Sequence, residues 1–90
     1  MSSFNKWIGI GNLGRDAEMR YVSSGTAVAS FSIACTEHWR DRDGTQKEKT
    51  EWVRCSVWGK QAEAIQQYLT KGKSVLVEGR LSTSKYQAKD

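Results

Sequence analysis

Two tryptophans and an arginine share one face of a predicted strand at residues 52–58. Trp52, Arg54 and Trp58 occupy alternate positions with aliphatic or small residues between them, which is the period of a half-buried strand. Because a sheet normally turns its aliphatic face inward, the two indoles and the guanidinium are expected on the outer face. Indole rings stack on unpaired nucleobases while Lys and Arg hold phosphates, so this face predicts a platform for a single nucleic-acid strand.

A second interpretation keeps the strand but gives its indoles another role. Trp52 and Trp58 would then fill a further core, either under a helix or against a second subunit. The platform is favoured because the flanking residues are basic and a buried Arg54 would need an ionic partner. Residues 41–49 are mostly charged around Gly44, and they predict a long mobile hairpin tip that joins this strand to the one before it.

The size and charge of the chain limit the class of protein. Its 90 residues predict one small domain, 1–90, whose core would gain from oligomerisation. A net charge of +4 at pH 7 favours an anionic partner. No apolar run approaches the roughly 20 residues of a membrane span, and the first residues match no signal or transit peptide. We therefore expect a cytoplasmic protein without a membrane partner.

The sequence offers no set of residues suited to catalysis or metal binding. His38 is the single histidine, so no Ser/His/Asp or Cys/His set exists, and it reads as a groove-edge or solvent residue. Asp41 and Asp43 lie in the charged loop, where acids are usually solvated. Cys35 and Cys55 read as small buried residues, without zinc-site spacing and not as a disulfide in a reducing compartment. We expect no enzyme activity, cofactor, metal or small-molecule substrate.

Three glycines near the start match the spacing of a dinucleotide-binding turn, at Gly9, Gly11 and Gly14. That turn must open a crossover helix, and residues 15–22 are too few for one before the next turn. Gly14 instead predicts a bulge or bend where the first strand turns a barrel corner. Residues 17–21 are expected to continue this strand.

The next strand is predicted at residues 27–35, with one apolar face. Its inner residues are Ala27, Ala29, Phe31, Ile33 and Cys35. Counting onward places Trp39 on this inner face too. Either a bulge near Glu37 reverses the alternation, or the hairpin arm has already left the core.

A short helix and a final strand follow Trp58. Gly59 opens a helical pattern for which Gly72 is the expected terminator. In the strand from Val75 onward, the valines face one way and Leu76 the other. The order strand, strand, strand, helix, strand predicts a mainly β fold, an OB-fold Greek-key barrel with one short helix between the third and fourth strands. The fifth strand is missing, because residues 85–90 are too few for a loop and a strand, so the chain reads as truncated or the barrel as open.

Several dispersed motifs occur in the order found in bacterial-type single-stranded DNA-binding proteins. They are Asn5-Lys6, Ile10-Gly11-Asn12-Leu13-Gly14, Arg20-Tyr21, Gly25-Thr26-Ala27-Val28-Ala29, Trp39-Arg40-Asp41, Thr50-Glu51-Trp52, Gly59-Lys60, Ala62-Glu63, Tyr68-Leu69, Lys71-Gly72 and Glu78-Gly79. The chain resembles this family over nearly its whole length. The resemblance implies an OB-fold that binds single-stranded DNA with little sequence preference, forms a homotetramer, and protects DNA in replication, recombination and repair as a nucleoid-associated protein.

The resemblance also implies the binding residues, position by position. The stacking aromatics would be Trp39, Trp52, Trp58 and Tyr86. The residues that bind phosphates would be Lys6, Arg20, Arg40, Arg42, Lys47, Arg54, Lys60, Lys71 and Lys85. Tyr86 reads equally well as a surface aromatic from composition alone. Replication and repair proteins would be partners only if a native C-terminal tail follows Asp90.

Three positions depart from the family pattern. Ser82 and Ser84 occupy positions where relatives often have arginine, which predicts weaker contacts to the nucleic-acid backbone. Val53 occupies a position where many relatives have a histidine linked to subunit association, and this departure bears on the stability of the tetramer.

Two other functions agree with the same residues. An RNA-directed OB domain would use the same stacking chemistry on a strand that carries 2′-hydroxyls. An interaction module would use its exposed tryptophans to join subunits and would bind no nucleic acid.

Overall fold

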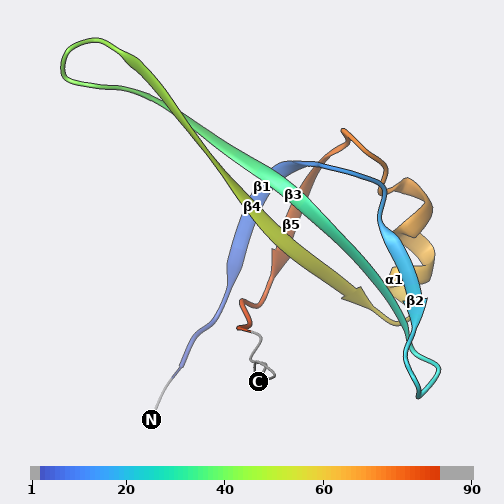
Figure 1. Ribbon diagram of the computed structural model, residues 1–90. Helices are drawn as coiled ribbons and strands as arrows, with labels where there is room; N and C mark the ends of the chain where they lie inside the picture. Colours follow the sequence, from blue (N-terminus) through green and yellow to red (C-terminus); the bar gives the residue numbers. More distant parts are fainter. Residues whose placement is uncertain (1–2, 84–90) are drawn as a thin grey trace, which may run out of the picture.

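The computed structural model describes residues 3–83, which form an open antiparallel barrel with a long projecting hairpin (Figure 1). The elements in chain order are β1 (Trp7–Leu13), β2 (Glu18–Tyr21), β3 (Ala27–Arg40), β4 (Gln46–Trp58), α1 (Lys60–Ile65), the 3-10 helix η1 (Gln66–Tyr68) and β5 (Ser74–Gly79). β1 and β2 are the two halves of the first barrel strand, so β3 and β4 are the second and third. The helix therefore follows the third barrel strand, and the prediction of a mainly β fold with this order is confirmed.

The first predicted strand is broken at Gly14 and Arg15. β2 pairs with β3 at residues 27–30, whereas β1 pairs with β3 only where Leu13 lies opposite Ile33 and Asn12 opposite Ala34. Both halves therefore lie along the same edge of β3, and β4 takes the other edge. The expected bend is confirmed, but the expectation of one strand through residue 21 is wrong, because the chain leaves the ladder at 14–17 to turn the corner.

The hairpin of β3 and β4 keeps one register from the barrel to its tip. Pairing runs from Val28 opposite Trp58 to Arg40 opposite Gln46 without a bulge. Every residue of β3 beyond Cys35 is exposed. This settles the alternation around Trp39: the arm has left the core before that residue, and no bulge reverses it.

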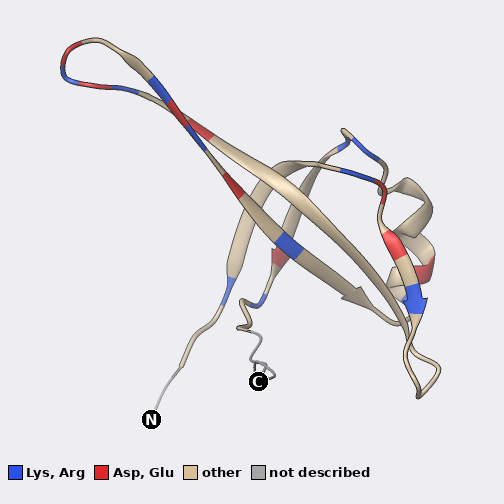
Figure 2. Cartoon of the chain, in the orientation of Figure 1, with Lys and Arg blue, Asp and Glu red and all other residues tan. Residues whose placement is uncertain are grey.

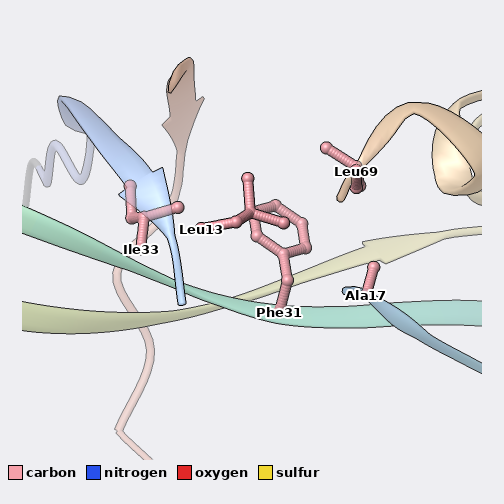
Figure 3. Close-up of a cluster of buried hydrophobic side chains, with 5 residues drawn as sticks. All are labelled: Leu13, Ala17, Phe31, Ile33 and Leu69. Atoms are coloured by element: carbon pink, nitrogen blue, oxygen red, sulfur yellow. The ribbon is translucent and has the colours of Figure 1, made fainter. Parts of the chain in front are cut away.

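The main core lies where β1, β3 and the chain after η1 meet (Figure 3). Its buried residues are Leu13, Ala17, Phe31, Ile33 and Leu69. Ile33 is fully buried. The predicted inner face of β3 is thus confirmed for its aliphatic and aromatic members, while Cys35 is only half-buried at the margin of this cluster.

A smaller core joins α1 to the start of β3. It contains Ala27, Ala29 and Ala62, and their short side chains let the helix approach the strand closely. On the same side, the hydroxyl of Tyr21 donates a hydrogen bond of 3.1 Å to the carboxylate of Glu63, which ties β2 to α1. This bond, together with the negative charge of Glu63, raises the pKa of Tyr21 above 10.0.

The helical segment is shorter than its pattern predicts. It ends at Tyr68, and Leu69 then turns into the main core with 7% of its surface exposed. Gly72, with φ of +86°, lies in the turn before β5 and not at the helix end. The prediction of Gly72 as terminator is wrong, because burial of Leu69 requires the chain to leave the helix earlier.

In β1 the glycines face inward and the isoleucines outward. A Cβ on Gly11 would lie 2.7 Å from the carbonyl oxygen of Ala34, so only glycine allows β3 to approach this closely. Ile8 and Ile10 are exposed, and Ile10 pairs with the exposed Leu76 of β5. Ile8, Ile10 and Leu76 form an apolar patch, which is termed the β1–β5 outer face.

Beyond β5, the chain remains attached to the segment before β1. The Asn5 side chain donates a hydrogen bond to the carbonyl of Leu81 at 2.8 Å and accepts one from its N–H at 3.0 Å. Residues 80–83 form no further strand. Residues 84–90, on which the predicted contacts of Lys85 and Tyr86 and the departure at Ser84 fall, lie outside the described part of the chain.

Candidate nucleic-acid interface

The candidate interface is one outer face of the sheet formed by β2, β3 and β4. Residues directly opposite each other in antiparallel strands project to the same side, so the pairing defines this face. Trp58 lies opposite Val28, which in turn lies opposite Arg20. Further along β4, the face continues through Arg54 and Trp52. The indole face is defined as Glu18, Arg20, Ser30, Ser32, Ala34, Trp52, Arg54, Ser56 and Trp58, with the buried Val28 between Arg20 and Trp58.

The two tryptophans of this face are open to solvent. Trp52 is 60% exposed and Trp58 is 58% exposed, and Arg54 between them is also exposed. The alternating residues of β4 are half-buried and pack on the main core: Val53, Cys55 and Val57. The predicted alternation is therefore confirmed, and a core that buries Trp52 and Trp58 within one protomer is excluded.

A groove of about 740 Å³ runs beside Trp52 and Arg54. Its lining comes from β4, from β3, from the bend between β1 and β2 and from the first residue of β2: Gly14, Arg15, Asp16, Glu18, Ser30, Phe31, Ser32, Trp52, Arg54, Cys55 and Ser56. Ser30 and Ser32 of β3 lie between the bulkier residues of β4 and those of the bend. Small central side chains flanked by larger ones make this part of the sheet concave.

The predicted basic residues are distributed over several surfaces. Arg20 and Arg54 lie on the indole face, and Arg40 lies at the far end of the same side of the arm. The other described ones lie elsewhere: Lys6 before β1, Arg42 in the tip turn, Lys47 on the opposite side of the arm, Lys60 at the start of α1 and Lys71 in the turn before β5. Figure 2 shows that residues of both charges occur along the arm and its tip.

Some of these cations are already paired. Lys6 lies 2.6 Å from the Glu78 carboxylate, and Lys47 lies 3.6 Å from Asp41. Among residues 3–83, Arg54 makes no ion pair. Its guanidinium is thus the central cation of the indole face that is available to an anion.

Trp39 does not belong to the indole face. It lies opposite Lys47, on the side of the arm that continues the core-facing residues of β3, and it is 45% exposed. Trp52 lies opposite Ala34 on the other side. The structure therefore gives the arm two aromatic surfaces, whereas the family resemblance groups Trp39 and Trp52 as one stacking set.

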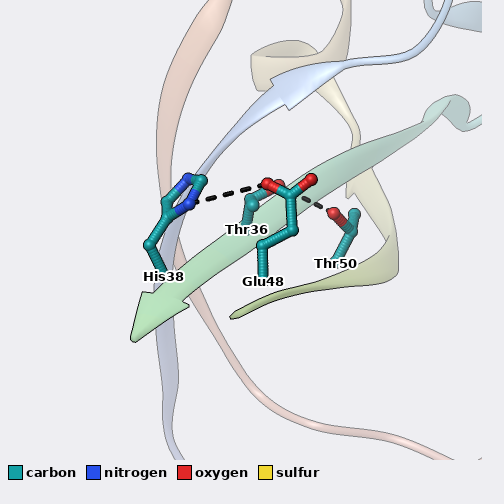
Figure 4. Close-up of polar contacts among 4 residues, drawn as sticks. All are labelled: Thr36, His38, Glu48 and Thr50. Carbon is teal, nitrogen blue, oxygen red and sulfur yellow. Dashed lines mark hydrogen bonds and ion pairs between the residues drawn. The ribbon is translucent and has the colours of Figure 1, made fainter. Parts of the chain in front are cut away.

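The arm between the barrel and its tip is held by polar pairs (Figure 4). The hydroxyls of Thr36 and Thr50 lie 2.9 Å apart, and Nδ1 of His38 lies 3.5 Å from Oε1 of Glu48. His38 is exposed, as expected for a solvent residue. At the tip, Asp43 accepts a hydrogen bond from the backbone N–H of Thr45 at 3.0 Å, and this bond lowers the pKa of Asp43.

Neither cysteine forms a disulfide. Cys35 and Cys55 are both free and half-buried. Burial raises the pKa of the Cys55 thiol, and the nearby Cys35 adds to this shift. Within residues 3–83, no three His, Cys, Asp or Glu side chains gather as metal ligands would.

Sequence reasoning gave no binding role to several residues that line the groove, among them Gly14 and Arg15. Gly14 was expected only to bend the strand, and Arg15 was assigned no role, yet both line the groove beside Trp52. The available signal was their position at the predicted corner, because a bend at that point brings its residues over the neighbouring strands.

The bent first strand, the helix between β4 and β5, and the aromatic, basic outer face together define an OB-type barrel domain with an open interface. Residues 4–90 match the model of the single-strand binding protein family. The chain belongs to this family.

Relatives and solved structures agree with this assignment. The single-stranded DNA-binding proteins of two Neisseria meningitidis strains, of serogroups A and B, are each 51% identical to the chain over 88 residues, or 98% of the chain and 51% of the relative. A solved Plasmodium falciparum SSB in complex with ssDNA superposes with a TM-score of 0.91 at 38% identity, over 100% of this chain and 80% of that one. A deletion mutant of the single-stranded DNA-binding protein from Thermus aquaticus gives a TM-score of 0.85 at 30% identity, over 96% and 42%.

The curated relatives are longer than this chain. The chain spans about half the length of the curated relatives it matches. The family is defined by single-strand binding and not by catalysis, in agreement with the prediction of a non-enzymatic protein. No helix within residues 3–83 is long and apolar enough to cross a membrane.

Proposed function

We propose that this protein binds single-stranded DNA with little sequence preference. The observation that carries the proposal is the outward exposure of Trp52 and Trp58 on either side of Arg54, next to a groove on the same face. Exposed indoles offer stacking surfaces to any unpaired base, and an unpaired guanidinium offers a phosphate contact. The Plasmodium falciparum SSB of similar fold was solved with ssDNA, which supports this choice of ligand.

The spacing along β4 suggests how a strand would lie. Trp52 and Trp58 are separated by about 20 Å at roughly 3.3 Å per residue, so they would stack on bases several nucleotides apart. Arg54 would hold the backbone between them. Arg20 would add a second cation on the same face, separated from Trp58 by Val28 of β3. Duplex DNA hides its base faces in the stack, so the indole face would discriminate against duplexes without reading sequence.

The remaining predicted contacts belong to the same proposal. Trp39, Arg40, Arg42 and Lys47 would bind along the arm and its tip. Lys6, Lys60 and Lys71 would bind phosphates at the barrel, and Tyr86 and Lys85 would act beyond the described residues. The domain 1–90 would thus protect single-stranded DNA in replication, recombination and repair, as a cytoplasmic protein associated with the nucleoid.

We also propose that the protein acts as a homo-oligomer, with a tetramer as the expected state. The β1–β5 outer face supports this, because Ile8, Ile10 and Leu76 form an exposed apolar patch that a second copy could cover. Within the described chain, β1 residues 7–11 pair only with β5, so their other edge is open to a strand of a second copy. Val53 is half-buried and packs on the main core.

Tryptophan fluorescence titration with oligo-dT at two salt concentrations tests the proposal. We expect quenching by stacking, and affinity that falls with salt by a log–log slope of about −0.7 for each phosphate neutralised. Light scattering on the same samples reports the oligomeric state, and Ile10→Glu should reduce it. Unquenched emission, or a preference for matched oligo-RNA in competition, would contradict the assignment to single-stranded DNA.

A further inference from the structure

A tyrosine and three cations lie next to the groove but outside the indole face. Tyr68 ends η1 with 58% of its surface exposed, and Nζ of Lys73 lies 5.9 Å from the centre of its ring. Lys71 is exposed in the same turn, and Arg15 is exposed at the bend after β1. These four residues, Arg15, Tyr68, Lys71 and Lys73, are termed the basic edge.

The basic edge has a fixed position relative to the groove. The Asp16 carboxylate accepts a hydrogen bond from the backbone N–H of Lys71 at 2.9 Å, and Ala17 donates its N–H to the carbonyl of Leu69 at 2.9 Å. Two more backbone bonds tie the same segments: Gly72 N–H to Leu13 O at 2.8 Å and Leu13 N–H to Lys73 O at 2.9 Å. The bend and the turn before β5 therefore lie side by side.

Arg15 is common to the groove and the basic edge. It lines the groove together with Trp52 and Arg54. Within residues 3–83, Arg15, Lys71 and Lys73 make no ion pair. Of the two acids that line the groove with Arg15, Asp16 accepts a hydrogen bond from a backbone N–H, and Glu18 is exposed. Three positive charges without an ion pair thus lie on the bend and the adjoining turn, and Arg15 is the one of them that also lines the groove.

We propose that the basic edge is a second contact for a single nucleic-acid strand, which receives nucleotides that leave the groove past Arg15. Tyr68 stacks on a base, and Arg15, Lys71 and Lys73 bind the phosphates on either side. This inference rests on the proposed function. It adds the direction in which the bound strand runs, from Trp52 across the bend to the turn before β5. A strand fits better than an acidic peptide, because an exposed aromatic ring accompanies the cations and the bend that carries Arg15 joins the groove to the turn.

The test compares two lengths of oligo-dT, of about 4 and about 16 nucleotides, with tryptophan fluorescence as the readout. The variants are Tyr68→Leu and Lys73→Ala, and Phe4→Leu serves as the matched control because Phe4 is an aromatic with 88% of its surface exposed on the segment before β1. We expect wild-type affinity of all three for the short oligomer. Tyr68→Leu should bind the long one about 5- to 150-fold more weakly, and Lys73→Ala should flatten its log–log salt slope by about 0.7.

The outcomes separate this inference from the proposed function. If wild-type protein is quenched by both oligomers and neither variant changes binding of the long one, the basic edge is refuted while the indole face stands. If wild-type protein is quenched by neither oligomer, both proposals fail. If poly-glutamate displaces oligo-dT less well from the variants than from wild-type protein, while the variants bind the long oligomer as tightly as wild type, the basic edge is a peptide site and the inference is overturned. Lys73→Ala keeps the test decisive should Tyr68→Leu fail to fold.

Discussion

Gly14 lies directly against the indole of Trp52. A Cβ built on Gly14 would come within 2.8 Å of Cζ3 and 3.0 Å of Cη2 of that ring. Carbon atoms in ordinary contact lie about 3.5–4.0 Å apart, so any side chain at this position must displace the ring. The glycine that bends the first strand thus also lets Trp52 occupy its place beside the groove.

Gly14→Ala should therefore weaken binding of oligo-dT without unfolding the protein. The methyl group pushes the Trp52 indole from its position, and we expect a loss toward the lower end of the about 1–3 kcal/mol found for removal of a stacked aromatic. Fluorescence titration measures it. The control is Gly79→Ala, because a Cβ at Gly79 meets nothing within 4 Å and should leave affinity unchanged. Equal affinities for both variants would contradict a positioning role for Gly14.

Trp52 and Trp39 should differ in the length of DNA to which they respond. They lie on opposite sides of the arm, so a short strand seated on the indole face does not reach Trp39. Trp52→Ala should weaken both short and long oligo-dT by about 1–3 kcal/mol. Trp39→Ala should affect only an oligomer long enough to pass around the arm. Equal losses for a short oligomer in both variants would show that one continuous surface contacts both rings.

Arg54→Ala should reduce the salt dependence of binding. Its guanidinium lies between the two indoles on β4, and loss of one phosphate contact should flatten the log–log slope by about 0.7. Lys49→Ala is the matched control, because Lys49 lies on the other side of the arm and 3.5 Å from the Glu51 carboxylate. A slope unchanged by Arg54→Ala would place this arginine outside the phosphate path.

Tyr21→Phe should change how stability depends on alkaline pH. The hydrogen bond to Glu63 raises the pKa of Tyr21 above 10.0, so the folded state holds this proton more tightly than the unfolded state does. The contribution of the bond is complete below pH 10 and is lost as the pH rises through the raised pKa. Melting curves of the two proteins should differ most below pH 10 and converge above it. A difference that stays constant across this range would contradict the linkage.

The sequence predicted the elements whose residues alternate strongly. The faces of β3 and β4 and the outward position of Trp52 follow from a period of two, because a one-residue error would bury Arg54 and expose Val53. Membership of an OB-type fold followed from the order of elements. The end of the helix did not, because burial of Leu69 is a tertiary effect that local spacing does not report.

Other features depend on contacts between segments far apart in the chain. The inward glycines of β1 are explained by the backbone of β3, which only the folded structure brings near. Arg15 became a groove residue because the corner folds over β3 and β4. Alternation placed Trp39 on the core-side face of the strand, but only the pairing register excluded a bulge near Glu37 and so fixed the side on which its ring lies.

β3 and β4 pair without a bulge along the whole arm, so the side of the arm on which each residue lies is fixed by the residues before it. The pairing holds over the full span from Val28 to Arg40. Deletion of a single residue between Cys35 and Trp39 would therefore rotate every later side chain of that strand by half a turn. Trp39 would then lie on the same side of the arm as Trp52, four residue pairs further toward the tip, and the two aromatic surfaces would share one side.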